Sequence, residues 1–225
     1  MTRPAACLID VYETILSCDF SQHSRKMPAL AGVTPQDWHA GISRVGPLFN
    51  VGRLTKTEGF GQILREYGVE PRTDLVRALV EADRELLLAS AHLFDDSIPF
   101  LEKLRSRGVK TAIVSNCSEH TRDLLIKLGV PELVDAVILS CEVGAAKPSA
   151  RIFRHALEQL RVPPGAALFV DDQAAFCAGA AALGISAAQI IRGKGDGADG
   201  VDGQVPTAGI AVVRSLAEVE AILWG

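Results

Sequence analysis

The sequence carries little excess charge and no cysteine motif. Lys and Arg number 23 and Asp and Glu number 27, which leaves a net charge of −4 over 225 residues. Proteins that bind the nucleic-acid backbone normally show a basic excess, so we expect no nucleic-acid partner. The five cysteines contain no Cys-x-x-Cys pair, which disfavours a disulfide framework or a zinc site. We therefore expect a protein of a reducing, cytoplasmic compartment.

Long apolar runs are also missing. The first apolar stretch, Ala5–Ile9, is short and ends at Asp10, so we expect no signal peptide. The longest weakly polar run, Ala174–Ile191, is rich in alanine and is interrupted by two glycines, a serine and a glutamine. This composition is typical of a packed helix and its following strand, and we expect no membrane partner.

Short apolar runs alternate with helical patterns over most of the chain. Strands are expected at residues 5–9, 109–114, 136–139, 166–170 and 210–213. Helices are expected at residues 97–106, 119–128, 150–160, 174–183 and 216–223. Alternation of this kind predicts an α/β fold with a doubly wound, mostly parallel sheet.

One long segment breaks the alternation, because residues 21–92 contain no convincing strand. Thr34 and Pro35 are typical of a helix start, and helices are expected at 55–67 and 73–89. We predict a helical cap over residues 19–92, inserted into a core of residues 1–18 and 93–225. The segment 192–203 is rich in Gly and Asp, which predicts a surface loop whose role the sequence leaves open.

Reactive side chains follow the predicted strands at the points where they end. Asp10, Ser115 and the pair Asp171–Asp172 each follow an apolar run, and Lys147 precedes a helix after the third strand. The carboxyl ends of parallel strands meet at one edge of a sheet, where ligands bind. A lysine at a helix start opposes the helix dipole, so a nearby anion would explain Lys147. We expect one site made of these side chains.

Four segments resemble the motifs of the haloacid dehalogenase superfamily, in the family's order. They are Asp10–Thr14 (DVYET), Val114–Asn116 (VSN), Gly144–Pro148 (GAAKP) and Phe169–Gln173 (FVDDQ). The helical insert also falls where this family places a mobile cap of the C1 type. The resemblance implies a hydrolase with a Rossmann-like core and a small-molecule substrate.

The resemblance also implies a metal site. Asp10 would be the nucleophile that forms a covalent aspartyl intermediate. Mg²⁺ would be the cofactor, held by the carboxylates of Asp10 and Asp172 and by the backbone carbonyl of Tyr12, while Asp171 orients a water ligand of the metal. Few, hard oxygen ligands are what Mg²⁺ favours.

A phosphate-binding set is implied as well. Ser115 and Asn116 would donate hydrogen bonds to phosphoryl oxygens, and Lys147 would supply a second cation. Ser115 and Lys147 would thereby join Asp10 as catalytic residues. The implied substrate is a small phosphate ester or anhydride, whose identity the sequence does not name.

The main departure from the family pattern is Tyr12, which stands where its phosphatases carry an aspartate as general acid and base. Tyrosine is a poor substitute at neutral pH. The first hypothesis is a phosphatase whose leaving group needs no proton, or whose acid comes from His23, His39 or Glu13. The second is a 2-haloacid dehalogenase, in which Asp10 displaces halide and no acid is needed. The third is a catalytically impaired ligand-binding domain.

The fourth motif favours the phosphatase. The family's dehalogenases need no metal and have Ser and Asn where this chain has Asp171 and Asp172, and an acidic pair would repel a haloacid carboxylate. The aromatic residues Trp38, Phe49 and Phe60 are candidates for the pocket-facing side of the cap. The sequence leaves the oligomeric state open, a homodimer included.

Overall fold

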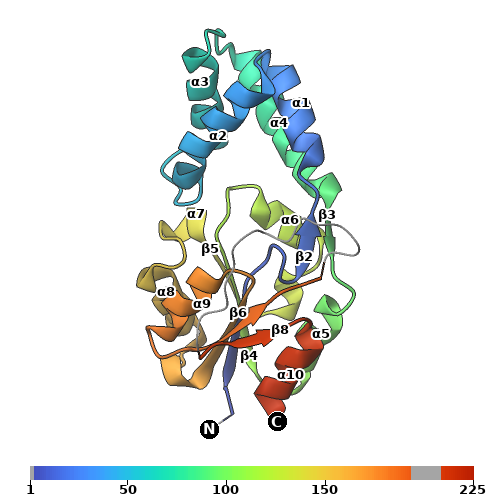
Figure 1. Cartoon of the computed structure of the whole chain (residues 1–225), viewed down its shortest axis with the longest axis vertical. Coiled ribbons are helices and arrows are strands. Elements are labelled where there is room, and N and C mark those ends of the chain that lie inside the picture. The colour runs from blue at the N-terminus through green and yellow to red at the C-terminus, as the bar shows by residue number, and fades with distance from the viewer. Residues whose placement is uncertain (1–2, 194–208) are drawn as a thin grey trace.

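The structure is a computed structural model that describes residues 3–193 and 209–225 (Figure 1). Its larger part is built on a six-stranded sheet with the order β5-β4-β1-β6-β7-β8 and parallel pairing throughout. The strands are β1 (Ala6–Ile9), β4 (Lys110–Ser115), β5 (Ala136–Leu139), β6 (Ala167–Asp171), β7 (Ser186–Ile190) and β8 (Ala211–Val213). The predicted α/β fold is confirmed. Most of the predicted loop 192–203 lies outside the described residues.

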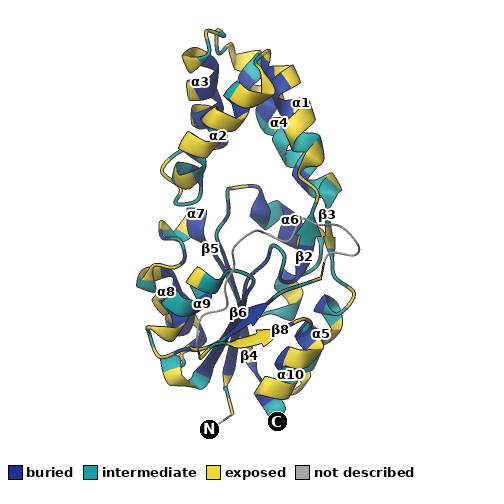
Figure 2. Ribbon diagram, viewed as in Figure 1, coloured by how far each residue is buried: buried dark blue, intermediate teal, exposed yellow. Residues whose placement is uncertain are grey.

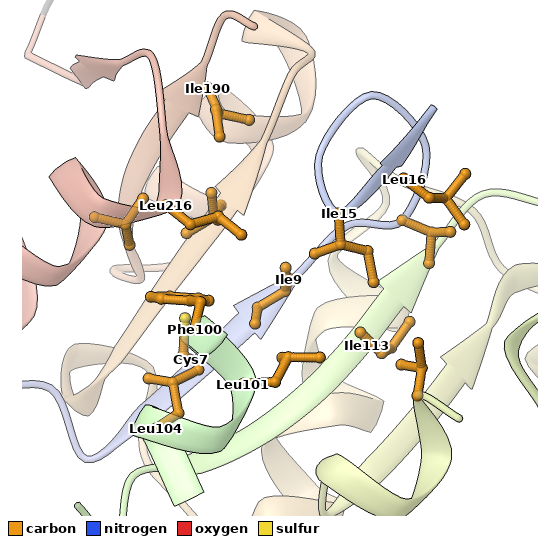
Figure 3. Close-up of a cluster of buried hydrophobic side chains, with 14 of the residues drawn as sticks. Cys7, Ile9, Ile15, Leu16, Phe100, Leu101, Leu104, Ile113, Ile190 and Leu216 are labelled. Carbon is orange, nitrogen blue, oxygen red and sulfur yellow. The ribbon is translucent and has the colours of Figure 1, made fainter. Parts of the chain in front are cut away.

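Helices cover both faces of this sheet. The first face carries α5 (Ser97–Ser106), α6 (Thr121–Lys127) and α10 (Leu216–Trp224). The opposite face carries α8 (Ala150–Leu160) and α9 (Ala174–Ala181). Figure 3 shows the first of the two cores, where Phe100, Leu101 and Leu104 of α5 pack on Cys7 and Ile9 of β1. With both faces covered, β1 is fully buried, which explains its continuous apolar run.

The chain changes direction across the sheet between β1 and β6. The α5 connection after β1 lies on one face of the sheet, whereas α9 after β6 lies on the other. The two strands are nonetheless direct neighbours, with Ile9 paired to Val170. Ligands of open α/β sheets bind at such a switch point, outside the carboxyl ends of the strands.

A two-stranded antiparallel ribbon separates the sheet from the remaining helices. Its strands are β2 (Leu16–Cys18) and β3 (Ala91–Leu93), with Ser17 opposite His92. The expectation of no strand within residues 21–92 was therefore wrong at its end. Three residues with one neighbouring strand are too short to give a period-two pattern in the sequence.

Four helices between the two ribbon strands form what we call the helical lobe. They are α1 (Ser21–Ala31), α2 (Pro35–Phe49), α3 (Lys56–Glu66) and α4 (Thr73–Ser90). Thr34 caps α2 by accepting a 3.1 Å hydrogen bond from the Asp37 N–H, as its sequence predicts. The lobe has its own core around Trp38, Phe60 and Leu79, and Figure 2 shows its outer surface as mainly exposed.

Shorter elements complete the described chain. The helix α7 (Ser140–Val143) follows β5, and 3₁₀ turns lie at Pro131–Leu133 and Pro164–Ala166. Within the part of the chain that the structure describes, no helix combines the length and the apolar character needed to cross a membrane.

Candidate functional site

Asp10 lies directly after β1, at the switch point of the sheet. Its backbone N–H donates to the carbonyl of Val170 over 2.9 Å, which holds it beside the end of β6. The chain then turns sharply, and the N–H groups of Ile15 and Leu16 both donate to the carbonyl of Val11. Glu13 takes a left-handed conformation with φ of 53° within this turn. The turn therefore leaves the Asp10 side chain at the carboxyl edge of the sheet.

Three carboxylates and one lysine meet at this edge. Asp10, Asp171 and Asp172, which we call the carboxylate cluster, each place an oxygen within 4.8 Å of the others. The Lys147 Nζ donates to Asp10 Oδ1 over 2.5 Å and to Asp171 Oδ2 over 2.6 Å. The four side chains come from segments up to 162 residues apart, since Asp10 and Asp172 are numbered 10 and 172. Only the parallel sheet brings them together.

The carboxylate cluster carries more negative charge than Lys147 balances. Burial and the neighbouring Asp10 carboxylate raise the pKa of Asp171, and the same two causes raise the pKa of Asp172 to about 6. Burial by itself would lower the pKa of Lys147, but Asp10 and Asp171 outweigh it, so that the pKa of this lysine is raised. The site thus holds one lysine in its ammonium form and three carboxyl groups, so that acidic groups outnumber the single cation.

This donor set fits a hard divalent cation. All three candidate ligand atoms are carboxylate oxygens, which Mg²⁺ prefers. A cation would also compensate the charge of the Asp10 carboxylate, which, after burial, is the second cause of the raised pKa values of Asp171 and Asp172. The residues predicted as metal ligands through their carboxylates are therefore together, whereas the predicted contribution of the Tyr12 carbonyl stays a prediction.

Asn116 and Gly179 hold the segment that carries Lys147. The Asn116 side chain accepts from the Lys147 N–H over 2.7 Å and donates to the Lys147 carbonyl over 2.9 Å. A Cβ atom at Gly179 would lie 2.7 Å from the Pro148 Cβ, so glycine allows α9 to approach this loop closely. The predicted phosphate donor Asn116 is therefore engaged mainly in fixing the lysine.

Ser115 ends β4 and is fully buried. Its Oγ atom has no hydrogen-bond partner among the residues that the structure describes. Buried hydroxyls are normally satisfied, so an orphaned one at a sheet edge is suited to an incoming ligand. The predicted phosphate contact of Ser115 stays a prediction.

Tyr12 directs its hydroxyl towards Thr121, the first residue of α6. The Tyr12 hydroxyl lies 2.9 Å from Thr121 Oγ1, and burial raises the pKa of the phenol. A phenol held in its neutral form is a weak acid at neutral pH. Of the other acid candidates, His23 and His39 line the adjoining cavity.

A cavity of about 560 Å³ lies between this edge of the sheet and the helical lobe. Such a volume suits a small organic molecule. Tyr12 and Asn116 line it from the sheet side and Trp38 from the lobe. Of the other two aromatic candidates, Phe60 is fully buried in the lobe core and Phe49 borders a separate, smaller cavity.

Two charged residues of the cavity wall escaped the sequence prediction. Lys56 and Asp83 form a buried ion pair there. One signal existed, because Lys56 opens α3 directly after its cap Thr55, a position that opposes the helix dipole as Lys147 does. No sequence signal singled out Asp83, because aspartate is a common residue in a helix that carries many charged side chains.

Comparison with known proteins places the chain among hydrolases. The family model described as haloacid dehalogenase-like hydrolase matches residues 4–184. A glyceraldehyde 3-phosphate phosphatase of Methanopyrus kandleri is 34% identical over 137 residues, which cover 60% of this chain and 59% of the relative. The match therefore spans less than two thirds of that relative's length. An (S)-2-haloacid dehalogenase of Pseudomonas sp. is 28% identical over 83% of this chain and 84% of its own.

Solved structures share the fold over the whole chain. The crystal structure of a HAD phosphatase from Thermococcus onnurineus matches with a TM-score of 0.66 and 26% identity, and the match covers 98% of both chains. Magnesium complexes occur among further structures of this fold at 20% identity, a level that concerns the fold alone.

Proposed function

The chain belongs to the haloacid dehalogenase-like hydrolase family, and on that premise we propose that it hydrolyses a small phosphate ester or anhydride through Asp10, with Mg²⁺ as cofactor. The observation that carries the proposal is the carboxylate cluster with its surplus of negative charge around one buried lysine. Bound at Asp10 and Asp172, Mg²⁺ would supply positive charge against the phosphate dianion.

Asp10 is the proposed nucleophile. One of its carboxylate oxygens bonds to phosphorus while the bond from phosphorus to the leaving oxygen breaks, and the leaving group departs with the electron pair. Water then attacks the phosphorus, which releases inorganic phosphate and restores the Asp10 carboxylate. Lys147 holds Asp10 in place and neutralises charge as the phosphate approaches. Ser115 offers its free hydroxyl to a phosphoryl oxygen.

The environment of Tyr12 restricts the leaving group. Because its pKa is raised and its hydroxyl is hydrogen-bonded to Thr121, the Tyr12 phenol offers little acid catalysis to the departing oxygen. We therefore favour leaving groups that depart without a proton, such as the carboxylate of an acyl phosphate or an acidic phenol. An alcohol would leave slowly from this site.

A dehalogenase is the second candidate. It is favoured by Tyr12, the aromatic residue at this position, and by the relative named as a haloacid dehalogenase. The three carboxylates around one lysine speak against it, because an anionic haloacid would meet a surplus of like charge.

A paired turnover assay separates the two candidates. One arm follows phosphate release from acetyl phosphate and p-nitrophenyl phosphate with Mg²⁺ and then with EDTA, and the other follows chloride release from L-2-chloropropionate. Phosphate release that needs Mg²⁺ and is lost in Asp10→Asn supports the proposal. Chloride release that EDTA does not affect would overturn it in favour of the dehalogenase. Silence in both arms would favour the impaired ligand-binding domain.

A further inference from the structure

A second buried lysine–aspartate pair lies in the lobe wall of the cavity. The Lys56 Nζ at the start of α3 is 3.1 Å from Asp83 Oδ2 in α4, and the two side chains are only 11% and 13% exposed. The Nε2 atoms of His23 and His120 approach the same carboxylate to 3.9 and 3.8 Å. We call these four residues the Asp83 cluster.

The Asp83 cluster leaves no positive charge free for a ligand. Lys56 is the one lysine or arginine among the described residues that line the cavity, and Asp83 neutralises it. The same ammonium also lies over the rings of Phe49 and Phe60, at 4.9 and 5.4 Å from their centres. A second anionic group on a substrate would therefore meet a carboxylate and an engaged ammonium ion.

His23 adds a neutral imidazole ring to this wall. Its Nε2 lies 3.3 Å from the backbone carbonyl of Asp83, which can only accept, so Nε2 carries the proton. Burial lowers the pKa of His23, and the ring is neutral at neutral pH. The remaining nitrogen, Nδ1, is buried without a partner in the described part of the chain. An uncharged ring in this place offers no attraction to a carboxylate.

Apolar side chains form much of the remaining wall. Met27, Trp38, Ile42 and Leu87 line the cavity from the lobe. The body of a bound molecule is therefore surrounded by hydrocarbon and aromatic surface, which favours an apolar ligand body. Besides the Asp83 cluster, the polar residues Ser24 and His39 also line the cavity from the lobe.

From these contacts we infer that Asp83 is a specificity-determining residue, which makes the cavity select phosphorylated compounds whose organic part is apolar and uncharged. An aryl or acyl group with a hydroxyl or amide tip fits this chemistry, whereas a group with a second carboxylate does not. The inference rests on the proposed function, because it concerns the organic part of that substrate.

The first test compares three para-substituted phenyl phosphates on the full chain. The substituents are hydroxymethyl, carboxylate and aminomethyl, which are neutral, anionic and cationic, and acetyl phosphate serves as the reference substrate. We expect kcat/KM for the hydroxymethyl compound to exceed that for the carboxylate by at least about tenfold, since like charges repel in a dry site. Equal values, or a preference for the carboxylate, would overturn the inference.

Two variants then move the charge in opposite directions. Asp83→Asn frees the Lys56 ammonium, and we expect the ratio of kcat/KM for the carboxylate to that for acetyl phosphate to rise by about tenfold. Lys56→Met frees the Asp83 carboxylate and should favour the aminomethyl compound instead. Glu85→Gln removes an exposed carboxylate from the same helix and should change no ratio. Unchanged ratios in both cluster variants would contradict the role of Asp83.

A binding arm keeps the inference separate from hydrolysis. The chain has two tryptophans, and in a Trp224→Phe background Trp38 reports directly on the cavity that it lines. We expect 4-hydroxybenzyl alcohol to quench its fluorescence at lower concentration than 4-hydroxybenzoate, and Asp83→Asn to reverse the order. If the protein releases no phosphate but binds 4-hydroxybenzyl alcohol more tightly than 4-hydroxybenzoate, the proposed function is contradicted and the proposed selectivity is supported. If the protein releases phosphate but binds the two compounds equally well, only the proposed selectivity is contradicted.

Discussion

The carboxylate cluster and the Asp83 cluster both bury a lysine against aspartate, but their charge balance differs. At the sheet edge, Lys147 faces Asp10 and Asp171, with Asp172 nearby. In the helical lobe, Asp83 is the one carboxylate that pairs with the Lys56 ammonium among the described residues. The carboxylate cluster has more carboxylates than ammonium groups and is suited to bind a cation. In the Asp83 cluster one carboxylate neutralises one ammonium group, which is suited to exclude charged groups. Similar residue types thus give opposite chemistry, according to how many carboxylates surround one ammonium ion.

Removing the lysine of the first cluster should have the largest effect. Lys147→Met leaves buried carboxylates without their partner, and breaking a buried ion pair in this way costs about 3–5 kcal/mol of folding free energy. We expect phosphate release to be lost and the unfolding midpoint in urea to fall, with partial recovery on adding Mg²⁺. Lys127→Met, which removes an exposed lysine bonded to the Leu88 carbonyl, is the control. A stable and active Lys147→Met enzyme would contradict the statement that the buried carboxylates need Lys147 as their partner.

Displacing the lysine without removing it tests how finely the first cluster is positioned. Gly179→Ala places a Cβ 2.7 Å from the Pro148 Cβ and 2.9 Å from the Pro148 carbonyl oxygen, so the Lys147 segment must shift. A misplacement of this order costs about 10²-fold in kcat. Gly165→Ala has open space around the new methyl group and should keep wild-type turnover. Steady-state kinetics on acetyl phosphate decides, and equal kcat values for the two variants would contradict the prediction.

Ser115, at the end of the neighbouring strand β4, should separate function from stability. Ser115→Ala removes a buried hydroxyl that has no partner among the described residues. We expect a fall in kcat/KM of about 10- to 100-fold, because a hydrogen bond to a charged oxygen contributes about 1.5–3 kcal/mol. Thermal unfolding should be unchanged or occur at higher temperature, since the lost hydroxyl was unsatisfied. Ser97→Ala, which breaks a 2.6 Å bond to the Ile15 carbonyl, should instead lower stability.

The smallest expected effect concerns pH and the Asp83 cluster. Burial lowers the folded-state pKa of His23 below its usual 6.5. The stability that neutral His23 contributes is therefore fully present above about pH 6.5 and is lost as the pH falls through the folded pKa. The fall in melting temperature from about pH 7.5 to about pH 5.5 should be smaller in His23→Gln than in the wild type. His92→Gln, at an exposed position on β3, should behave as the wild type does.

Two further features, one in the helical lobe and one in the neighbouring ribbon, show the limits of prediction from local pattern. Three of its helices were expected, but no individual helix was assigned to α1, which has Pro28 inside it and no side-chain hydrogen bond at its cap. Tertiary packing of Met27 and Ala31 into the lobe core offsets those weak local signals. The ribbon strand β3 was missed because its stability comes from β2, whose Ser17 pairs with His92 from 75 positions away in the chain.

The sequence by itself determined the parallel sheet and the residues at its edge. Apolar runs that end in Asp10, Ser115 and Asp171 contain this information locally, because strand ends of a parallel sheet must converge. Tertiary structure alone decided that Asn116 holds the Lys147 segment, that Ser115 Oγ has no partner among the described residues and that Lys56 meets Asp83. The physical reason is that side-chain charge balance depends on distances between separate helices and loops, and no periodicity along the chain encodes those distances.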